Sequence, residues 1–290
     1  MANCTSLAGS SNTQQPLFIA KISDTKIFGK LLKAIVTKNK DAHLFINGEE
    51  LRIQISSLNF FHKIAVIKRQ QFSNYEFRFN RENREIHLPI FGEAFLESLT
   101  MFHPGRSSCL YDEQKITWIL EIRSLYSPLI VTIDQSNIKT TWTLERLESA
   151  KPENPRLDEN LVVKFAITGS NFKKYFRDIG LFGRTFTLEH SSQDRGSFAR
   201  IKMSDVYGES EIAIAHDSAI YHKIYVPNFS FNYNNRFLAK EFVKTAADSA
   251  SVDIEIDIHG VLHINIDRIP GFISKNGGFK LDCWLVANDD

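Results

Sequence analysis

One succession of apolar segments occurs twice along this chain, and it limits the possible folds more than any other feature. Apolar residues recur at spacings of about 2 in some segments and about 3.6 in others, which are typical of strands and helices respectively. Each half is predicted to contain one strand, one helix, four strands, a second helix and three strands. The repeated unit is too long for a solenoid. The pattern therefore predicts two strand-rich domains of similar architecture.

The first copy occupies residues 16–144. Its predicted helices cover residues 25–36 and 88–102. Strands are predicted at residues 17–22, 41–46, 51–56, 60–67, 75–79, 116–122, 129–133 and 138–144.

A charged segment containing Pro152 and Pro155 follows at residues 145–160, and its composition predicts an interdomain linker. The second copy occupies residues 161–290, with helices predicted at 170–179 and 235–247. Its strands are predicted at residues 161–168, 184–190, 198–204, 209–215, 229–233, 252–258, 261–266 and 279–286. Residues 1–15 are rich in Ser, Asn, Thr and Gln and are expected to form a disordered tail.

The bulk composition excludes several classes of protein. Lys plus Arg number 35 and Asp plus Glu number 34, so a protein that coats nucleic acid over its whole surface is not expected. No run of about 18 apolar residues exists, which argues against a membrane-spanning helix. The cysteines at positions 4, 109 and 283 are far apart in sequence, and this spacing favours a reducing intracellular compartment over a disulfide framework.

Basic residues recur on one face of three of the four predicted helices, and the fourth helix instead carries Glu93 and Glu97. A solvated surface is the ordinary interpretation for any single helix. Recurrence in a nearly neutral chain favours contacts with phosphates, which bind without sequence specificity. The candidate DNA-facing residues are Lys26, Lys30, Lys33, Lys173, Lys174, Arg177, Arg236, Lys240 and Lys244.

Signals for catalysis and for metal or cofactor binding are weak. Asp253, Glu255 and Asp257 alternate along one predicted strand, which is the best candidate for a metal-dependent nuclease. The solvent face of an amphipathic strand explains the same alternation. His259 and His263 are four residues apart but lie in a predicted hairpin, where that spacing does not place both on one face. We therefore expect no catalytic residue, metal or cofactor.

The strands at residues 138–144 and 209–215 are candidate edge strands. Pairing of such edges between neighbouring molecules closes a ring and leaves no edge free. The candidate subunit-interface residues are Ile138, Thr140, Trp142, Glu211, Ile212 and Ile214.

Four stretches of the chain resemble the PCNA family of sliding clamps. They are FIAKISDTKIFGKLLKAI at 18–35, MSDVYGESEIAIA at 203–215, FNYNNRFLAKEFVKTA at 231–246 and VDIEIDIHGVLHINI at 252–266. The resemblance covers roughly residues 17–287. It implies an α+β fold of duplicated clamp domains, with antiparallel sheets outside and helices lining a central hole.

Within that family the chain is most similar to the Rad-one branch of the heterotrimeric checkpoint clamp, the 9-1-1 ring, as judged from LLKAI and the near-neutral charge. This resemblance implies a non-enzymatic nuclear subunit that encircles DNA at damage sites and recruits checkpoint and repair proteins. It also implies two paralogous sister subunits, Rad-nine-like and Hus-one-like, an ATP-dependent clamp loader and double-stranded DNA as partners. The basic helix residues would line the hole, and the two edge strands would pair with the sisters.

Two alternatives stay open from the sequence. One is a divergent, homotrimeric replication clamp, and the other is a 3′–5′ exonuclease that uses the carboxylate strand at 253–257. In PCNA the interdomain linker flanks a pocket for partner peptides. The linker at 145–160 is distinctive, so binding of a standard PCNA-interacting peptide stays open as well.

Overall fold

The computed structural model shows the same order of helices and strands in both halves of the chain. It describes residues 15–57, 60–78, 84–100, 116–135, 138–179, 184–194, 196–206, 208–238, 240–267 and 279–288. The tail expected at the N-terminus therefore lies outside the described residues, apart from Gln15.

The first half alternates strands with two α-helices in its described residues. The order is β1 (Phe18–Ile22), α1 (Thr25–Ile35), β2 (Asp41–Ile46), β3 (Glu50–Ser57), β4 (Phe61–Lys68), β5 (Asn74–Phe77), β6 (Ile86–Phe91), α2 (Gly92–Thr100), β7 (Ile116–Ile122), β8 (Leu129–Gln135) and β9 (Ile138–Leu144). A 3-10 turn, Arg69–Gln71, lies between β4 and β5.

The second half repeats this order. It contains β10 (Leu161–Ile167), α3 (Gly169–Phe176), β11 (Thr185–Ser191), β12 (Ser197–Asp205), β13 (Gly208–Ala215), β14 (Ala219–Ile224), β15 (Asn228–Asn234), α4 (Lys240–Ala246), β16 (Ser251–Asp257), β17 (Leu262–Asp267) and β18 (Lys280–Leu285). Short 3-10 turns precede β14 at His216–Ser218 and α4 at Asn235–Phe237.

One strand in each half was missed by the sequence patterns. The predicted helix at 88–102 is wrong in its first part, because Ile86–Phe91 forms β6 and the helix begins at Gly92. The spacing of Phe91 and Phe95 suggests a helical stripe, but Phe91 is exposed, and the buried residues Ile86, Leu88 and Ile90 follow the spacing of two that is typical of a strand. Pro89 is tolerated because β6 is the last strand of its sheet. In the second half, the segment read as irregular before Val226 contains β14.

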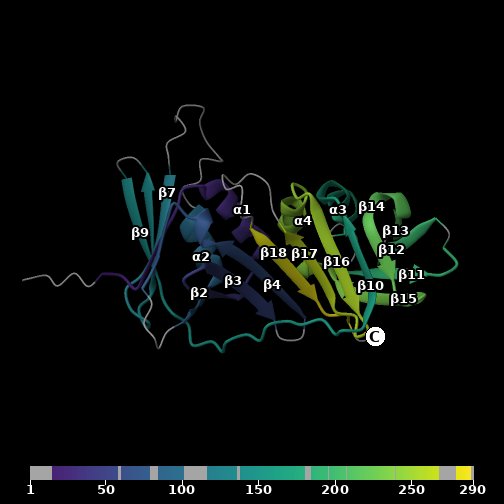
Figure 1. Ribbon diagram of the computed structural model, residues 1–290, viewed down its shortest axis with the longest axis horizontal. Helices are drawn as coiled ribbons and strands as arrows, with labels where there is room; N and C mark the ends of the chain where they lie inside the picture. Colours follow the sequence, from purple (N-terminus) through teal and green to yellow (C-terminus); the bar gives the residue numbers. More distant parts are fainter. Residues whose placement is uncertain are drawn as a thin grey trace, which may run out of the picture.

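The strands form three antiparallel sheets within the described residues. Their orders are β5-β1-β7-β8-β9, then β14-β10-β16-β17-β18-β4-β3-β2-β6, then β13-β12-β11-β15. The nine-stranded sheet in the middle joins five strands of the second half to four of the first, where β18 pairs with β4 from Lys280↔Val66 to Leu285↔Phe61. The two halves therefore share one continuous sheet (Figure 1).

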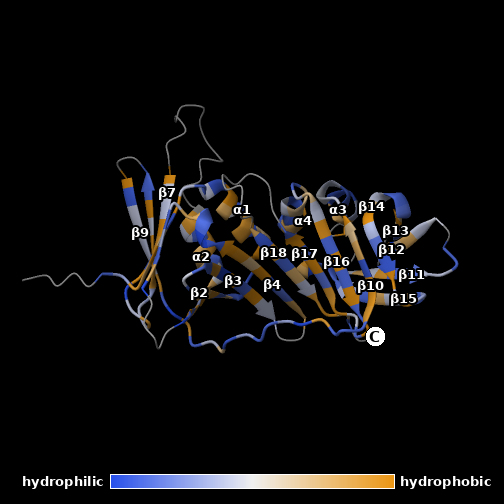
Figure 2. Cartoon of the chain, in the orientation of Figure 1, coloured by the Kyte–Doolittle hydropathy of each residue, from blue (hydrophilic) through white to orange (hydrophobic). Residues whose placement is uncertain are grey.

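The α-helices lie on one side of this row of sheets (Figure 1). In α1 the side chain of Asp24 accepts a hydrogen bond from the backbone N–H of Ile27 and caps the helix. Phe28, Leu31 and Leu32 of α1 are buried, because they share the face of the helix that meets the sheet. Along the strands, hydrophobic and hydrophilic bands alternate (Figure 2), so one face of each sheet joins the core under the helices. No helix among the described residues is long and apolar enough to span a membrane.

Residues 145–160 form neither helix nor strand and run along the side of the sheets opposite the helices (Figure 1). The backbone N–H of Leu147 donates to the carbonyl of Pro89 at 2.9 Å. Further along, Lys151 Nζ lies 3.2 Å from a Glu85 carboxylate oxygen, and Gln54 donates to the carbonyl of Glu153 at 3.1 Å. This segment is thus attached to the nine-stranded sheet. The division of the chain at 16–144, 145–160 and 161–290 stays a prediction.

Candidate functional site

All nine candidate DNA-facing side chains are exposed, and eight of them lie on an α-helix or at its C-cap. Lys26, Lys30 and Lys33 lie on α1, Lys173 and Lys174 lie on α3 with Arg177 at its C-cap, and Lys240 and Lys244 lie on α4. The expectation that Arg236 shares a helix with the last two is wrong. Arg236 lies in the 3-10 turn at Asn235–Phe237.

The early break in this last helix has a local cause. The side chain of Asn234 accepts a hydrogen bond from the backbone N–H of Arg236, and buried Asn235 donates from its amide to the carbonyl of Ile179 at 3.0 Å. Asn side chains compete in this way with helical hydrogen bonds. The chain therefore turns once before α4 begins at Lys240.

Helix packing brings most of these cations into one layer. Helix α1 packs against α4 and against α2, and α3 packs against α4. Lys30 Nζ lies 3.8 Å from a carboxylate oxygen of Asp248, which follows α4. The layer is positive but not uniformly so, because Glu241 pairs with Lys244 and Asp178 pairs with Arg177. The hydrogen bond from Arg177 lowers the pKa of Asp178, which keeps that carboxyl charged.

The two candidate interface strands are sheet edges in the described structure. Strand β9 pairs only with β8 there, and β13 pairs only with β12. Ile138 is 64% exposed, and Trp142 packs partly against the core while its indole N–H has no hydrogen-bond partner among the described residues. The remaining four candidates are half-buried Thr140 and Ile212, exposed Glu211 and buried Ile214.

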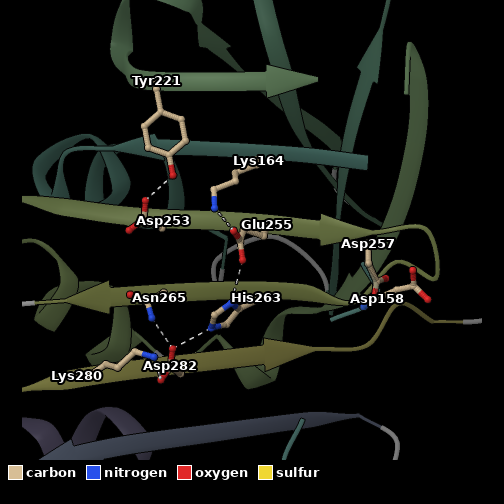
Figure 3. Close-up of polar contacts among 10 residues, drawn as sticks. All are labelled: Asp158, Lys164, Tyr221, Asp253, Glu255, Asp257, His263, Asn265, Lys280 and Asp282. Atoms are coloured by element: carbon tan, nitrogen blue, oxygen red, sulfur yellow. Dashed lines mark hydrogen bonds and ion pairs between the residues drawn. The ribbon is translucent and has the colours of Figure 1, made fainter. Parts of the chain in front are cut away.

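The three carboxylates of β16 each have a structural partner (Figure 3). Tyr221 donates to Asp253 at 2.8 Å. Glu255 lies 2.6 Å from Lys164 Nζ. Asp257 is buried and accepts hydrogen bonds from three backbone N–H groups, those of Asp158, His259 and Val261.

His263, which the sequence brought up only beside His259 as a weak metal-site candidate, is buried next to these carboxylates. His263 Nε2 lies 2.8 Å from Asp282 and Nδ1 lies 3.5 Å from Glu255, and the ring stacks on Trp284 with centroids 3.8 Å apart (Figure 3). Burial opposes charge on His263, but its hydrogen bonds to Asp282 and Glu255 together outweigh burial and raise its pKa. Hydrogen bonds, first that from His263, lower the pKa of Glu255 to about 2. In the sequence, His263 and Asn265 alternate with apolar residues along one strand, and Asp282 stands between the apolar residues of another. This alternation was the signal for a polar cluster on one sheet face.

Asn265 and Lys280 also contact Asp282, at 2.7 and 3.2 Å, so its carboxylate is fully engaged. His259 lies in the turn, 3.6 Å from Asp158, and is separate from His263. No group of three or more His, Cys, Asp or Glu side chains among the described residues has the geometry to hold a metal ion. The cluster at β16–β18 is thus a set of ion pairs on a sheet face.

A polar pocket of about 650 Å³ lies between the linker and the nine-stranded sheet, with Lys40, His43, His62, Lys151 and Pro152 among its lining residues. His43 Nδ1 lies 3.0 Å from His87 Nε2, and burial is the first cause that lowers the pKa of both rings, that of His87 to about 4. The polar lining of this pocket differs from that of an apolar groove for a peptide.

Comparison with known proteins identifies both the family and the fold. The family model described as repair protein Rad1/Rec1/Rad17 matches residues 17–267. No curated protein sequence matches the chain.

Solved structures of the same fold cover the chain almost completely. PCNA of Entamoeba histolytica superposes with a TM-score of 0.69 at 12% identity, covering 95% of this chain and 100% of that one. A chain of the PCNA2–PCNA3 complex of Sulfolobus tokodaii gives 0.68 at 15% identity, with 93% and 99% covered. PCNA of Thermococcus kodakaraensis gives 0.67 at 12% identity, with 93% and 100% covered. The fold is that of the PCNA-like clamps, and since the family match spans most of the sequence, the chain belongs to the Rad1/Rec1/Rad17 family of repair proteins.

Proposed function

We propose that this chain is one subunit of a heterotrimeric checkpoint clamp that encircles DNA at sites of damage and serves as a platform for checkpoint signalling and repair factors. It functions in the nucleus, with two paralogous sister subunits, an ATP-dependent loader and double-stranded DNA as partners. It needs no catalytic residue, metal or cofactor of its own. The observation that carries the proposal is the pairing of β18 with β4 inside the chain, because two equivalent strands are left as edges.

The equivalence of β9 and β18 follows from the strand registers. In the first half, Ile22 at the end of β1 pairs with Trp118, which pairs with Ile133, which pairs with Thr140 of β9. In the second half, Ile167 at the end of β10 pairs with Val252, which pairs with Ile266, which pairs with Leu281 of β18. Thr140 therefore occupies the place of Leu281.

The equivalence of β13 and β4 follows in the same way. Leu44 of β2 pairs with Ile53, which pairs with Ala65 of β4. The matching path from Leu188 of β11 reaches Ile212 of β13. Since Leu281 pairs with Ala65 inside the chain, the open edges of two adjoining subunits would meet with the equivalents of Thr140 and Ile212 opposite each other.

The internal junction of β18 with β4 also favours different chains over identical copies as neighbours in the ring. At the internal junction Leu285 faces Phe61, whose ring stacks on Phe237 with centroids 4.4 Å apart. The equivalent pair between two copies would be Leu144 and Gly208. No described atom lies within 4 Å of the position where a Cβ of Gly208 would stand. Self-pairing would thus leave the space beside Gly208 unfilled, whereas a sister strand with a larger residue in the place of Leu144 would fill it.

The helix layer supports DNA as the enclosed partner. All the exposed candidate cations except Arg236 lie on α1, α3 and α4 or at a helix end, on the side of the sheets that carries the helices, and contacts from Lys and Arg to phosphates bind DNA of any sequence. The carboxylates of β16 do not favour the exonuclease alternative, because Asp253, Glu255 and Asp257 are each held by a neighbouring group.

The proposal is tested with the double variant Thr140→Cys, Ile212→Cys and gel filtration. We expect the purified chain alone to elute as a monomer and to form no disulfide-linked trimer under mild oxidation. Co-expression with the two sister clamp chains of the same organism should give a complex of one copy of each. The wild-type chain is the control for oxidation of its own cysteines.

A stable homotrimer of the chain alone, joined efficiently by the new cysteines, would instead support the replication-clamp alternative. Degradation of labelled DNA with Mg²⁺ that stops in the Asp253→Ala, Asp257→Ala variant would support the exonuclease.

A further inference from the structure

Helices α2 and α4 occupy equivalent places in the two halves but carry opposite charges. Each follows the strand that ends one sheet and precedes the first of three paired strands. Phe95 of α2 and Phe242 of α4 are both completely buried. The positions two residues before and after these rings are Glu93 and Glu97 on α2, and Lys240 and Lys244 on α4.

The reversed charge lies at one of the open edges. Helix α2 contacts β8 and β9, whereas α4 lies between α1 and α3 in the interior of the helix layer. Glu97 is exposed and Glu93 half-buried. Neither carboxylate forms an ion pair with any residue that the structure describes.

The other open edge presents cations. An open cleft of about 700 Å³ lies between α3 and β13, and Lys174, Arg177 and Ile212 are among its lining residues. Lys174 has no ion pair within the described part of the chain. Arg177 pairs with Asp178, and Asp217 also lines the cleft, so its positive charge is partly offset.

The internal junction shows how helices meet across such an edge. Where β18 pairs with β4, α4 packs against α1, and Lys30 of α1 lies 3.8 Å from Asp248 at the end of α4. Lys30 and Lys174 are equivalent, because each follows a completely buried phenylalanine, Phe28 or Phe172, by two residues. At a junction between subunits, the α2-type helix of one would therefore pack against the α3-type helix of the next.

We propose that Glu93 and Glu97 form the docking surface for a basic helix of one sister subunit, and that the Lys174–Arg177 cleft receives an acidic helix of the other. This inference rests on the proposed ring and adds the chemistry that each neighbour must bring. Charge complementarity across an interface sets the orientation of the partners, since like charges placed together are strongly unfavourable. The chain's own α2 and α3 are complementary as well, so the choice of a sister over a second copy rests on the strand edges. Helix-to-helix ion pairs would then connect the subunits beside the paired strands.

The test uses the ternary complex co-expressed with both sister chains. The neighbour at each edge is identified first. Thr140→Cys on β9 and Ile212→Cys on β13 are each combined with cysteines at the matching strand positions of the sisters. Mass spectrometry of the disulfide-linked species then shows which sister lies at which edge. Glu93→Lys, Glu97→Lys should then weaken binding of the β9 neighbour about tenfold or more at low salt and leave the other unchanged. Lys174→Glu, Arg177→Glu should weaken binding of the β13 neighbour alone.

Two matched controls separate edge contacts from general charge. Lys26→Glu, Lys33→Glu reverses exposed cations on α1, away from both edges, and should leave both sisters bound. Glu76→Lys, Glu159→Lys reverses exposed carboxylates elsewhere and should do the same. The wild-type affinities should also fall with added salt, because exposed ion pairs are screened.

Two results would overturn the inference while leaving the ring itself intact. One is unchanged affinity for both sisters in both edge variants. The other is an intact complex in which Glu93→Lys, Glu97→Lys only strengthens DNA binding, which would place these carboxylates toward the hole. Failure of the wild-type chain to bind either sister would instead remove the proposed function, and this inference with it.

Discussion

His263 lies among charged groups on the sheet face that turns away from the helices. Its imidazole is held between Asp282 and Glu255 and covered by Trp284. A carboxylate pair around a buried ring stabilises the imidazolium. This single side chain therefore couples the pairing of β16, β17 and β18 to pH.

His263→Ala should lower the free energy of unfolding by roughly 3 kcal/mol at pH 6, since it removes one partner of a buried charged group. The raised pKa gives the sign of the pH dependence. The contribution of His263 is complete below about pH 6.5, its ordinary pKa, and is lost as the pH rises through the raised value. Urea unfolding of both proteins from pH 5 to 9 should show the difference shrinking with rising pH. His259→Ala, in an exposed turn, is the control, and a constant difference across this range would contradict the assignment.

Lys63 is completely buried, and its ammonium donates only to the hydroxyl of Thr37, at 3.3 Å, among the described hydrogen bonds. Burial lowers its pKa. We expect Lys63→Met to raise the free energy of unfolding by roughly 1 kcal/mol at pH 7, because it removes a charge that is costly to bury. The gain should vanish as the pH approaches 10.5, where lysine is also neutral in the unfolded chain. Lys68→Met, which changes an exposed lysine paired with Glu50, should bring no gain under denaturant titration.

At the scale of elements, helix α1 and the edge strands have separate tasks. The strands complete sheets by backbone hydrogen bonds, so their register matters more than their side-chain identity. The helices cover one face of those sheets and expose their basic residues on the other side of each helix. DNA contact can therefore be tested on α1, apart from the subunit contacts proposed at the edge strands and at α2 and α3.

Lys26→Glu, Lys33→Glu on α1 should weaken retention of the assembled ring on DNA without unfolding the chain, because both side chains are exposed and have no ion pair among the described residues. If both contact phosphates, the slope of log affinity against log salt should fall by about 2. Fluorescence anisotropy with duplex DNA at several salt concentrations measures it. Glu76→Lys, Glu159→Lys controls for the change in charge. An unchanged slope would mean that α1 does not face DNA.

At the scale of the whole molecule, the linker is a weaker connection between the halves than the sheet. Six residue pairs join β18 to β4, and α1 packs against α4 beside them. By contrast, the linker crosses the outside with a few hydrogen bonds and, among the described residues, two ion pairs, Lys151 with Glu85 and Asp158 with His259.

Cutting the chain in the linker should leave the halves associated. A protease site inserted after Asn154, an exposed position without helix or strand, allows the cut in the folded protein. After cleavage, the two fragments should elute together in gel filtration, because the shared sheet holds them. A chain cut in the same way but with Leu281→Asp, which puts a charge in the buried row of β18, should separate. Separation of the unmodified fragments would show that the linker, not the sheet, joins the halves.

The sequence by itself determined most of the elements, because apolar spacing within a segment is a local property. The strands at 41–46 and 138–144 have the predicted bounds, and the helix predicted at 25–36 ends one residue earlier. Local rules failed where two patterns overlapped, as at Ile86–Phe91, or where side chains of Asn234 and Asn235 formed hydrogen bonds that delayed the start of a helix.

Only the tertiary structure decided which strands meet and which stay open. The pairing of β18 with β4 joins residues about 220 positions apart, and no spacing within either segment specifies it. The same holds for the carboxylates of β16, whose partners lie on other strands, Lys164 on the adjacent β10 and Tyr221 on β14 beyond it. Charges along a helix can be read in order, but the placement of Glu97 at an open edge and of Lys244 inside the layer depends on packing between the halves.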